Sequence, residues 1–179
     1  REDMEASGFE LQGNSFVKGD EVYLPLYEAK MFWHYDHRFG TYEGITDRSD
    51  THLNPIPSRD PDCLPLPWYW VNELTVINKI NTECSPYHLC FRDITNTTNE
   101  RTGIFSIIPF SAVGNNAPIM IFDHNPKEKV MFLISHFSSF VWDFCVRKKI
   151  GGTHLNFYLL KQLPCFPPSN IPPAIADYI

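Results

Sequence analysis

Alternation of apolar and polar positions predicts several short strands along the chain. EVYLPLY at residues 21–27 alternates moderately and is rich in β-forming side chains, and we expect it to pair with a second strand at 31–35. Three further runs, YHLCFRDI at 87–94, GIFSIIPF at 103–110 and APIMIF at 117–122, have the same character. The polar stretch SAVGNNAP predicts a turn between the last two strands.

Helical spacing is clearest after Pro126, over residues 127–149. Apolar side chains there recur every three to four positions and form one stripe, made of Val130, Leu133, Phe137, Val141 and Phe144. Lys148 and Lys149 complement the dipole at the end of this helix, and Gly151-Gly152 ends it. A shorter helix is predicted at 72–80, and a strand followed by a proline-rich exit is predicted from Thr153 onward.

Together these elements predict an α+β (mixed α/β) domain, in which an antiparallel or mixed sheet packs against one long helix. A length of 179 residues with 43% apolar composition is enough for one buried core. We expect residues 1–20 to be a leading segment whose Gly and Asp prepare a turn, 21–168 the domain, and 169–179 a C-terminal tail. Residues 44–67 are rich in turn-forming and proline residues and predict a long loop. Because the chain starts at Arg1, we expect a piece of a larger protein.

Cysteine content and hydropathy narrow the cellular setting. Five cysteines without a CxxC pair give neither a disulfide framework nor a zinc-finger spacing, so we expect a reducing, cytoplasmic environment. Apolar stretches are interrupted well before the roughly 20 residues that cross a bilayer, so no membrane partner is expected. A net charge of -6 argues against a uniformly basic nucleic-acid binder, so any contact with DNA must be local.

Metal ligands are present in the sequence but are not arranged diagnostically. His34 and His37 are separated by two residues, and Cys84, His88 and Cys90 form a second group. On a strand, positions 34 and 37 point to opposite faces, so the two imidazoles converge only across a bulge or on a helix. We expect no metal site.

A nuclease is one alternative function. Glu28-Ala29-Lys30 matches the E-x-K half of a metal-dependent nuclease, in which carboxylates hold magnesium and lysine orients water. The matching upstream carboxylate is misplaced, because Pro61-Asp62 follows the triplet rather than preceding it. The motif therefore has low specificity.

Cofactor and catalytic motifs are absent from the sequence. It contains no G-x-G-x-x-G, no G-x-x-x-x-G-K-[ST] and no G-x-S-x-G. Asn54-Pro55-Ile56-Pro57 departs from the Asn/Asp-Pro-Pro-aromatic loop with which amino-methyltransferases hold a flipped base. We therefore expect this chain to hold no cofactor and to contain no catalytic residue.

The composition of the polar segments favours a role in recognising DNA. RDITNTTNERT, GNN and RKKIGGTHLN combine arginine, asparagine, lysine and threonine beside aromatic residues. Arginine and asparagine read guanine and adenine by paired hydrogen bonds, while lysine and threonine anchor phosphates. The candidate DNA-contact residues are Arg38, Arg92, Asn96, Asn99, Arg101, Lys148, Lys149, Thr153, His154 and Asn156, and Thr97, Asn115, Asn116 and Arg147 share their segments.

A structural role is the alternative for the same residues. Asparagine and threonine also form turns and caps. Arg92 and Arg101 have Asp93 and Glu100 next to them in the sequence and could pair with these carboxylates.

Three blocks of the sequence resemble a known family: LPLYEAKMFWHYDHRFGTYEG, FRDITNTTNERTGIFSIIPFSAVGNNAPIM and KKIGGTHLNFYLLKQLPCFPP. They are similar to the C-terminal target-recognition part, with a TaqI-like specificity domain, of bacterial adenine-specific DNA methyltransferases and fused restriction-modification enzymes, and the similarity spans most of residues 21–168. The resemblance implies double-stranded DNA and an N-terminal methyltransferase domain of the same parent chain as partners. It also implies that S-adenosylmethionine is bound by that domain, which flips the target adenine.

The aromatic stretch at residues 23–44 then begins the recognition domain as a strand pair. Strand alternation places Trp33 and Tyr35 on one face and His34 and Asp36 on the other. Cationic side chains nearby, those of Lys30, His37 and Arg38, are expected to face either DNA or the methyltransferase. A docking module that makes no DNA contact is the remaining alternative.

Overall fold

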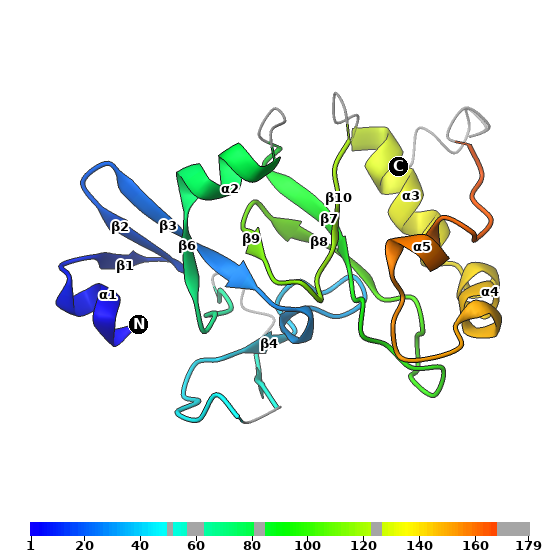
Figure 1. The fold of residues 1–179 in the computed structure, drawn as a ribbon, viewed down its shortest axis with the longest axis horizontal. Coiled ribbons are helices and arrows are strands. Elements are labelled where there is room, and N and C mark those ends of the chain that lie inside the picture. Colours follow the sequence, from blue (N-terminus) through cyan, green and yellow to red (C-terminus); the bar gives the residue numbers. More distant parts are fainter. Residues whose placement is uncertain (50–51, 57–62, 81–84, 123–126, 168–179) are drawn as a thin grey trace.

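The fold is known from a computed structural model, which describes residues 1–49, 52–56, 63–80, 85–122 and 127–167 (Figure 1). Helices and strands are both present, so the predicted α+β class is confirmed. The helical elements are α1 Glu2–Ala6, the 3-10 turn η1 Ala29–Met31, α2 Glu73–Ile80, α3 Lys127–Phe137, α4 Phe140–Lys149 and α5 Phe157–Leu160. The strands are β1 Glu10–Gln12, β2 Ser15–Lys18, β3 Glu21–Tyr27, β4 Gly40–Thr41, β5 Asn54–Pro55, β6 Trp70–Asn72, β7 Tyr87–Phe91, β8 Phe105–Pro109, β9 Ala112–Val113 and β10 Ile119–Met120.

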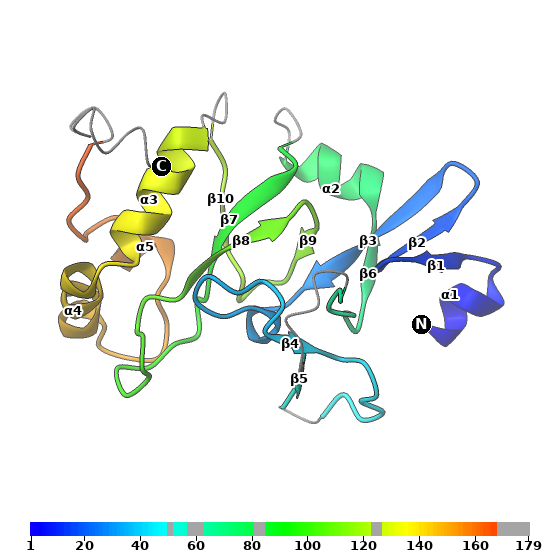
Figure 2. The same ribbon diagram turned by 180° about the vertical axis from the view of Figure 1, so that it is seen from behind.

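A first sheet has the order β1-β2-β3-β6, with every pair antiparallel, and β9 joins β3 in parallel. The leading segment thus contributes a hairpin to the same sheet as β3, and Gly19, at a φ of +57°, forms its turn with Asp20. A second sheet has the order β10-β7-β8, and β4 pairs with β5 separately. Figures 1 and 2 show the first sheet toward one end of the molecule and α3, α4 and α5 at the other.

The predicted strand at 31–35 is wrong. Its first residue ends η1, and Trp33 and Asp36 then exchange backbone hydrogen bonds of 2.7 and 3.0 Å across a tight turn. Tyr35 takes a φ of 61° in this turn, a conformation that no strand residue adopts. The alternation that was to separate Trp33 and Tyr35 from His34 and Asp36 therefore does not apply.

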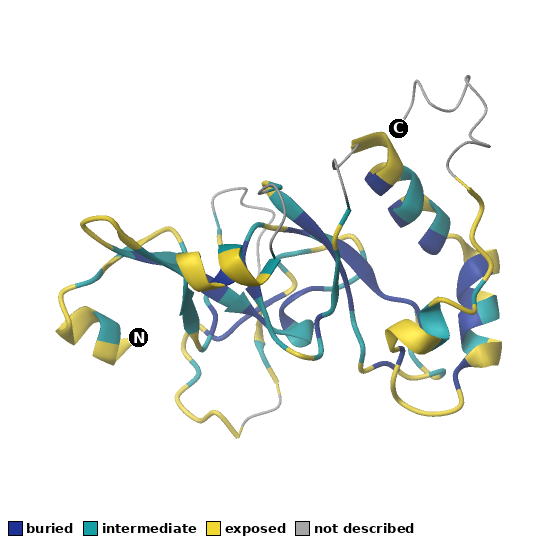
Figure 3. Ribbon diagram, turned by 45° about the horizontal axis from the view of Figure 1, so that its top comes forward, coloured by how far each residue is buried: buried dark blue, intermediate teal, exposed yellow. Residues whose placement is uncertain are grey.

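Aromatic packing between the second sheet and the helices forms the largest core cluster. Phe105 of β8 stacks on Phe137 of α3 with ring centroids 4.8 Å apart, and Phe137 lies at the same distance from Trp142 of α4. Each such ring removes a large apolar area from water. Figure 3 shows β7 and one side of α3 and α4 as buried, while α1 is mostly exposed.

The single long helix predicted at 127–149 is also wrong, because it is broken into α3 and α4 with a bend of 65°. At the break the Ser138 hydroxyl donates to the Ile134 carbonyl, and the Ser139 hydroxyl accepts the N–H of Trp142 at 3.2 Å as an N-cap. The new direction turns Trp142 inward and leaves Val141 and Phe144, part of the predicted stripe, 76% and 59% exposed.

Other predicted elements have mixed outcomes. The helix at 72–80 and the strands at 87–94 and 103–110 correspond to α2, β7 and β8 and are confirmed. The strand expected after Thr153 is wrong: Asn156 caps α5 by accepting the N–H of Leu159 at 3.0 Å. Within the described ranges no single helix is long and apolar enough to cross a membrane; the bent α3–α4 pair reaches the required length and composition only when its helices are taken together.

Candidate nucleic-acid interface

The loop between β7 and β8 is fixed to α4 by a buried carboxylate and a guanidinium. Asp143 is 5% exposed, and its Oδ1 accepts the backbone N–H groups of Thr102 at 2.9 Å and Gly103 at 2.7 Å. Its Oδ2 lies 3.1 Å from Nη2 of Arg147. Arg147 in turn donates to the carbonyls of Thr97, Asn99 and Glu100. These bonds hold the polar loop in a single conformation, although its sequence alone would allow several.

The segment after α4 lies alongside this loop (Figure 1). Thr95 N–H donates to the Thr153 carbonyl at 3.0 Å, and Leu155 N–H donates to the Asp93 carbonyl at 2.7 Å. Asp93 Oδ2 also lies 2.8 Å from His154 Nδ1. We call residues 93–101 and 147–156 together the loop end, and it contains most of the candidate DNA-contact residues: Asn96, Asn99, Arg101, Lys148, Lys149, Thr153, His154 and Asn156.

Exposure at the loop end differs from residue to residue. Lys148, Lys149 and Thr153 are exposed and belong to the end of α4 and the segment that follows it. Asn96 is exposed too, but its Oδ1 accepts the N–H of Thr98 at 3.0 Å in an Asx turn. The cations therefore face solvent, whereas the asparagine also shapes its own loop.

Two candidate arginines are engaged by the protein itself. Arg92 donates to the Phe32 carbonyl through Nε at 2.9 Å and Nη2 at 2.5 Å, and its guanidinium lies 4.6 Å from the Trp33 ring centroid. Burial lowers the pKa of Arg92 to about 10. Arg101 donates to the Ser138 carbonyl at 2.9 Å and stacks 4.2 Å above the ring of Phe140. Both guanidinium groups thus contact carbonyls and aromatic rings in place of the neighbouring carboxylates of Asp93 and Glu100.

Arg38, the remaining candidate, lies in the turn that follows Asp36. Its backbone N–H donates to Asp36 Oδ1 at 2.8 Å, and its side chain is half-buried. Its location is thus in the aromatic turn rather than in the loop end.

A cavity of about 620 Å³ lies where the first sheet meets the segments after β7 and β9. Its lining includes the cations Lys30, Arg48 and Arg92 and the amides Asn115 and Asn116. We call it the basic cavity. It adjoins the loop end, since lining residue Ile94 bridges to His154 and the Asn116 carbonyl accepts the N–H of Asp93 at 3.0 Å.

Glu28 is a carboxylate in the lining of the basic cavity, and both of its oxygens have partners. Oε1 lies 2.9 Å from Arg48 Nη2, and Oε2 accepts the hydroxyl of Tyr42 at 2.7 Å. Burial, and then the bond to Glu28, raises the pKa of Tyr42. These bonds favour a structural role for Glu28 over the magnesium-binding role of the nuclease alternative, whose Pro61-Asp62 lies outside the described residues.

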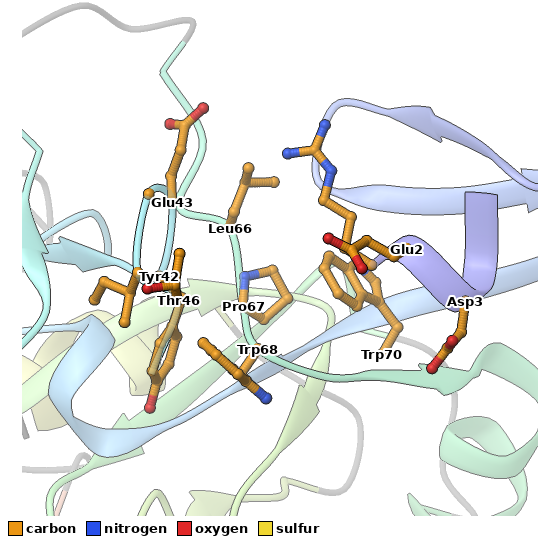
Figure 4. Close-up of a pocket in the computed structure, with 12 residues that line it drawn as sticks. Glu2, Asp3, Tyr42, Glu43, Thr46, Leu66, Pro67, Trp68 and Trp70 are labelled. Atoms are coloured by element: carbon orange, nitrogen blue, oxygen red, sulfur yellow. The ribbon is translucent and has the colours of Figure 1, made fainter. Parts of the chain in front are cut away.

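A second cavity, of about 430 Å³, has three carboxylates and the cation Arg1 in its lining. Figure 4 shows the rings of Tyr42, Trp68 and Trp70 along it together with the carboxylate residues Glu2, Asp3 and Glu43. Acidic groups gather here and cations gather at the basic cavity, so the net charge of -6 is unevenly distributed. Phosphate groups are therefore attracted more strongly to the basic cavity than to this one.

The histidines and cysteines considered as metal ligands are buried or half-buried wherever the structure describes them. His34 Nδ1 accepts the N–H of Phe105 at 3.4 Å, and His88 and Cys90 are buried on β7. Burial lowers the pKa of His88 and raises that of Cys90. Across the ranges that the structure describes, no three His, Cys, Asp or Glu side chains gather as a metal site; Cys84 lies outside those ranges.

Sequence reasoning missed three residues that build these sites. Asp143 was not singled out, although Asp143 and Arg147 stand four apart on a helix, a spacing that brings opposite charges together. Arg48 and Tyr69 also went unnoticed, because nothing in the surrounding loop sequence indicates that they reach the same cavity as Arg92.

Comparison with known proteins finds no family model that matches the chain, and no curated protein or solved structure with a significant match. The resemblance to target-recognition domains therefore stays a prediction from the three sequence blocks.

Proposed function

We propose that the chain is the sequence-reading DNA module of an adenine-specific DNA methyltransferase or restriction-modification enzyme, with catalysis in another domain of the parent chain. In this role the loop end contacts the grooves and phosphates of double-stranded DNA. S-adenosylmethionine is bound by the catalytic domain, and the protein works in the cytoplasm. The cysteines of the described residues, all free thiols, agree with that compartment.

The observation that carries this proposal is the convergence of the candidate residues. Residues from segments about fifty positions apart, 93–101 and 147–156, are joined by backbone hydrogen bonds at the loop end. The exposed cations Lys148 and Lys149 lie there, and the basic cavity adjoins it. Anchoring by Asp143 and Arg147 preorganises the loop, which lowers the entropy lost when it binds a rigid partner.

A charge-matched pair of variants tests the proposal. Replacing Lys148 and Lys149 together by alanine removes two charges at the loop end, and replacing Lys127 and Lys129 removes two from the exposed start of α3. Binding of a labelled duplex is followed by fluorescence anisotropy as salt is raised. Each phosphate contact contributes about 0.9 to the slope of log K against log salt, so the first variant should reduce the slope by about 1.8.

The second variant should leave the slope unchanged. If the wild type and both variants gave equal slopes, we would conclude that the loop end does not contact DNA.

A docking module without DNA contact is the second candidate, and the outer face of α4 favours it. Phe140, Val141 and Phe144 are 80%, 76% and 59% exposed on one helix. Clustered apolar side chains of this kind commonly mark protein interfaces. Tight binding of a methyltransferase domain that is lost in Phe140→Ser, with no duplex binding at low salt, would decide for this function.

A further inference from the structure

The charge balance of the basic cavity is uneven. Arg92 gives both of its hydrogen bonds to a neutral carbonyl, and in the described part of the chain no carboxylate forms an ion pair with it. Glu28, the carboxylate of the lining, is already paired with Arg48. Among the described residues, the lining has no further carboxylate to pair with Lys30 or Arg92, and a desolvated guanidinium is costly without a counter-charge.

The rest of the lining suits an aromatic, hydrogen-bonding ligand. Tyr69 is 50% exposed at the wall, where the Arg48 guanidinium lies 5.7 Å from its ring centroid, and Leu26 and Ile94 supply apolar surface. Asn115 and Asn116 offer amide groups that can both donate and accept, as the edges of nucleobases require. Cations near amides and a ring face form a combination that binds a phosphate and a base at the same time.

The size of the cavity agrees with such a ligand. Pockets that enclose small molecules have volumes of about 300 to 1,000 Å³. At about 620 Å³ the basic cavity lies inside this range.

We propose that the basic cavity binds one nucleotide, with Lys30 and Arg92 toward the phosphate and Asn115, Asn116 and Tyr69 toward the base. The ligand is either a free nucleoside monophosphate or a single nucleotide extruded from DNA at the adjoining loop end. The second source rests on the proposed function, whereas the first does not.

Calorimetric titration of the whole chain tests the proposal with defined probes. The four deoxynucleoside monophosphates are compared with their nucleosides and with inorganic phosphate. At least one nucleotide should bind, and its nucleoside and phosphate should each bind about tenfold more weakly or worse, since each lacks one half of the contacts. Absence of nucleotide binding, or equal affinity for the nucleotide and its nucleoside, overturns the proposal.

Single substitutions locate the site, and the contact that Lys30→Ala removes within the protein is that of its Nζ with the Tyr42 ring, 5.5 Å from the centroid. Lys30→Ala should weaken nucleotide binding about tenfold while leaving the weak nucleoside affinity unchanged. Asn116→Ala should weaken both, because it acts on the base. Lys79→Ala, an exposed cation of α2 that does not line the cavity, is the control and should change neither. Arg92 is left intact because it also bonds Phe32.

Binding measurements with duplex DNA distinguish the two sources of the nucleotide. If a nucleotide is extruded from DNA, Lys30→Ala should weaken binding to a duplex with a mismatch more than to a fully paired one, since unpaired bases leave the stack at lower cost. Equal effects on both duplexes assign the cavity to free nucleotides.

The two proposals fail separately. If duplex binding depends on Lys148 and Lys149 but no nucleotide binds, the cavity proposal is overturned and the DNA-reading function stands. If nucleotide binding depends on Lys30 but no duplex binds, the DNA-reading function is overturned and the cavity proposal stands.

Discussion

Removing the Asp143 carboxylate should release the loop between β7 and β8 from α4. Asp143→Ala deletes two charge-assisted hydrogen bonds, from the N–H groups of Thr102 and Gly103, and the ion pair with Arg147. Bonds to charged groups contribute about 1.5 to 3 kcal/mol each, and breaking a buried pair costs about 3 to 5 kcal/mol. We therefore expect the free energy of unfolding to fall by about 3 to 5 kcal/mol.

Asp143→Asn is the matched control. Its amide oxygen keeps an acceptor for Thr102 and Gly103, but its NH2 group replaces the oxygen that accepts from Arg147, so we expect a loss of about 1.5 to 3 kcal/mol, that of one hydrogen bond to a charged group. Urea unfolding followed by tryptophan fluorescence measures both losses, since Trp142 lies in the core.

Hydrogen exchange at the amides of Thr102 and Gly103 reports the loop directly, and both should exchange faster in Asp143→Ala than in the wild type. The reasoning is refuted if Asp143→Ala changes the unfolding free energy by less than about 0.5 kcal/mol, the range of an ordinary surface substitution, and leaves both amides protected.

Further predictions concern packing, capping and pH. Gly103→Ala would place its Cβ 2.7 Å from the Trp142 ring and should cost about 1 to 3 kcal/mol in a denaturant melt, whereas Gly151→Ala, with open space around it, should cost almost nothing. Ser139→Ala should cost about 1 kcal/mol by the same measurement, because it removes the N-cap of α4; an unchanged midpoint would contradict the capping role. Burial lowers the pKa of His88, so the unfolded state takes up the proton first as pH falls below about 6.5, and stability should decline from pH 7.5 to 5.5. His88→Gln should flatten that decline, and an unaltered slope would exclude this histidine as its source.

Local pattern was enough for the short apolar strands of the second sheet. β7 and β8 were predicted because their apolar runs are short and rich in β-forming residues. The break between α3 and α4 was not predictable, because serine is tolerated inside helices and the apolar spacing continues through residues 138–139. Hydrogen bonds between the Ser138 and Ser139 side chains and the backbone favour the break between α3 and α4, and so does the burial of Trp142.

The candidate site was predictable in residue type but not in arrangement. Polar loop composition indicated Lys148, Lys149 and Thr153, which the structure places together at one end. The partner of Arg92 could not be read from neighbouring residues, because Phe32 approaches it from sixty positions away. Long-range contacts of this kind depend on the whole fold, so the basic cavity became visible only in three dimensions.

Selection from a randomised pool of duplexes tests the central claim most directly. The chain is incubated with the pool at low salt, and the bound DNA is sequenced after several rounds. A module that reads base edges should enrich one short motif, and Thr153→Ala should relax the preference at an individual position. Bound DNA with the same sequence distribution as the starting pool, or no bound DNA at all, would contradict sequence reading by this chain.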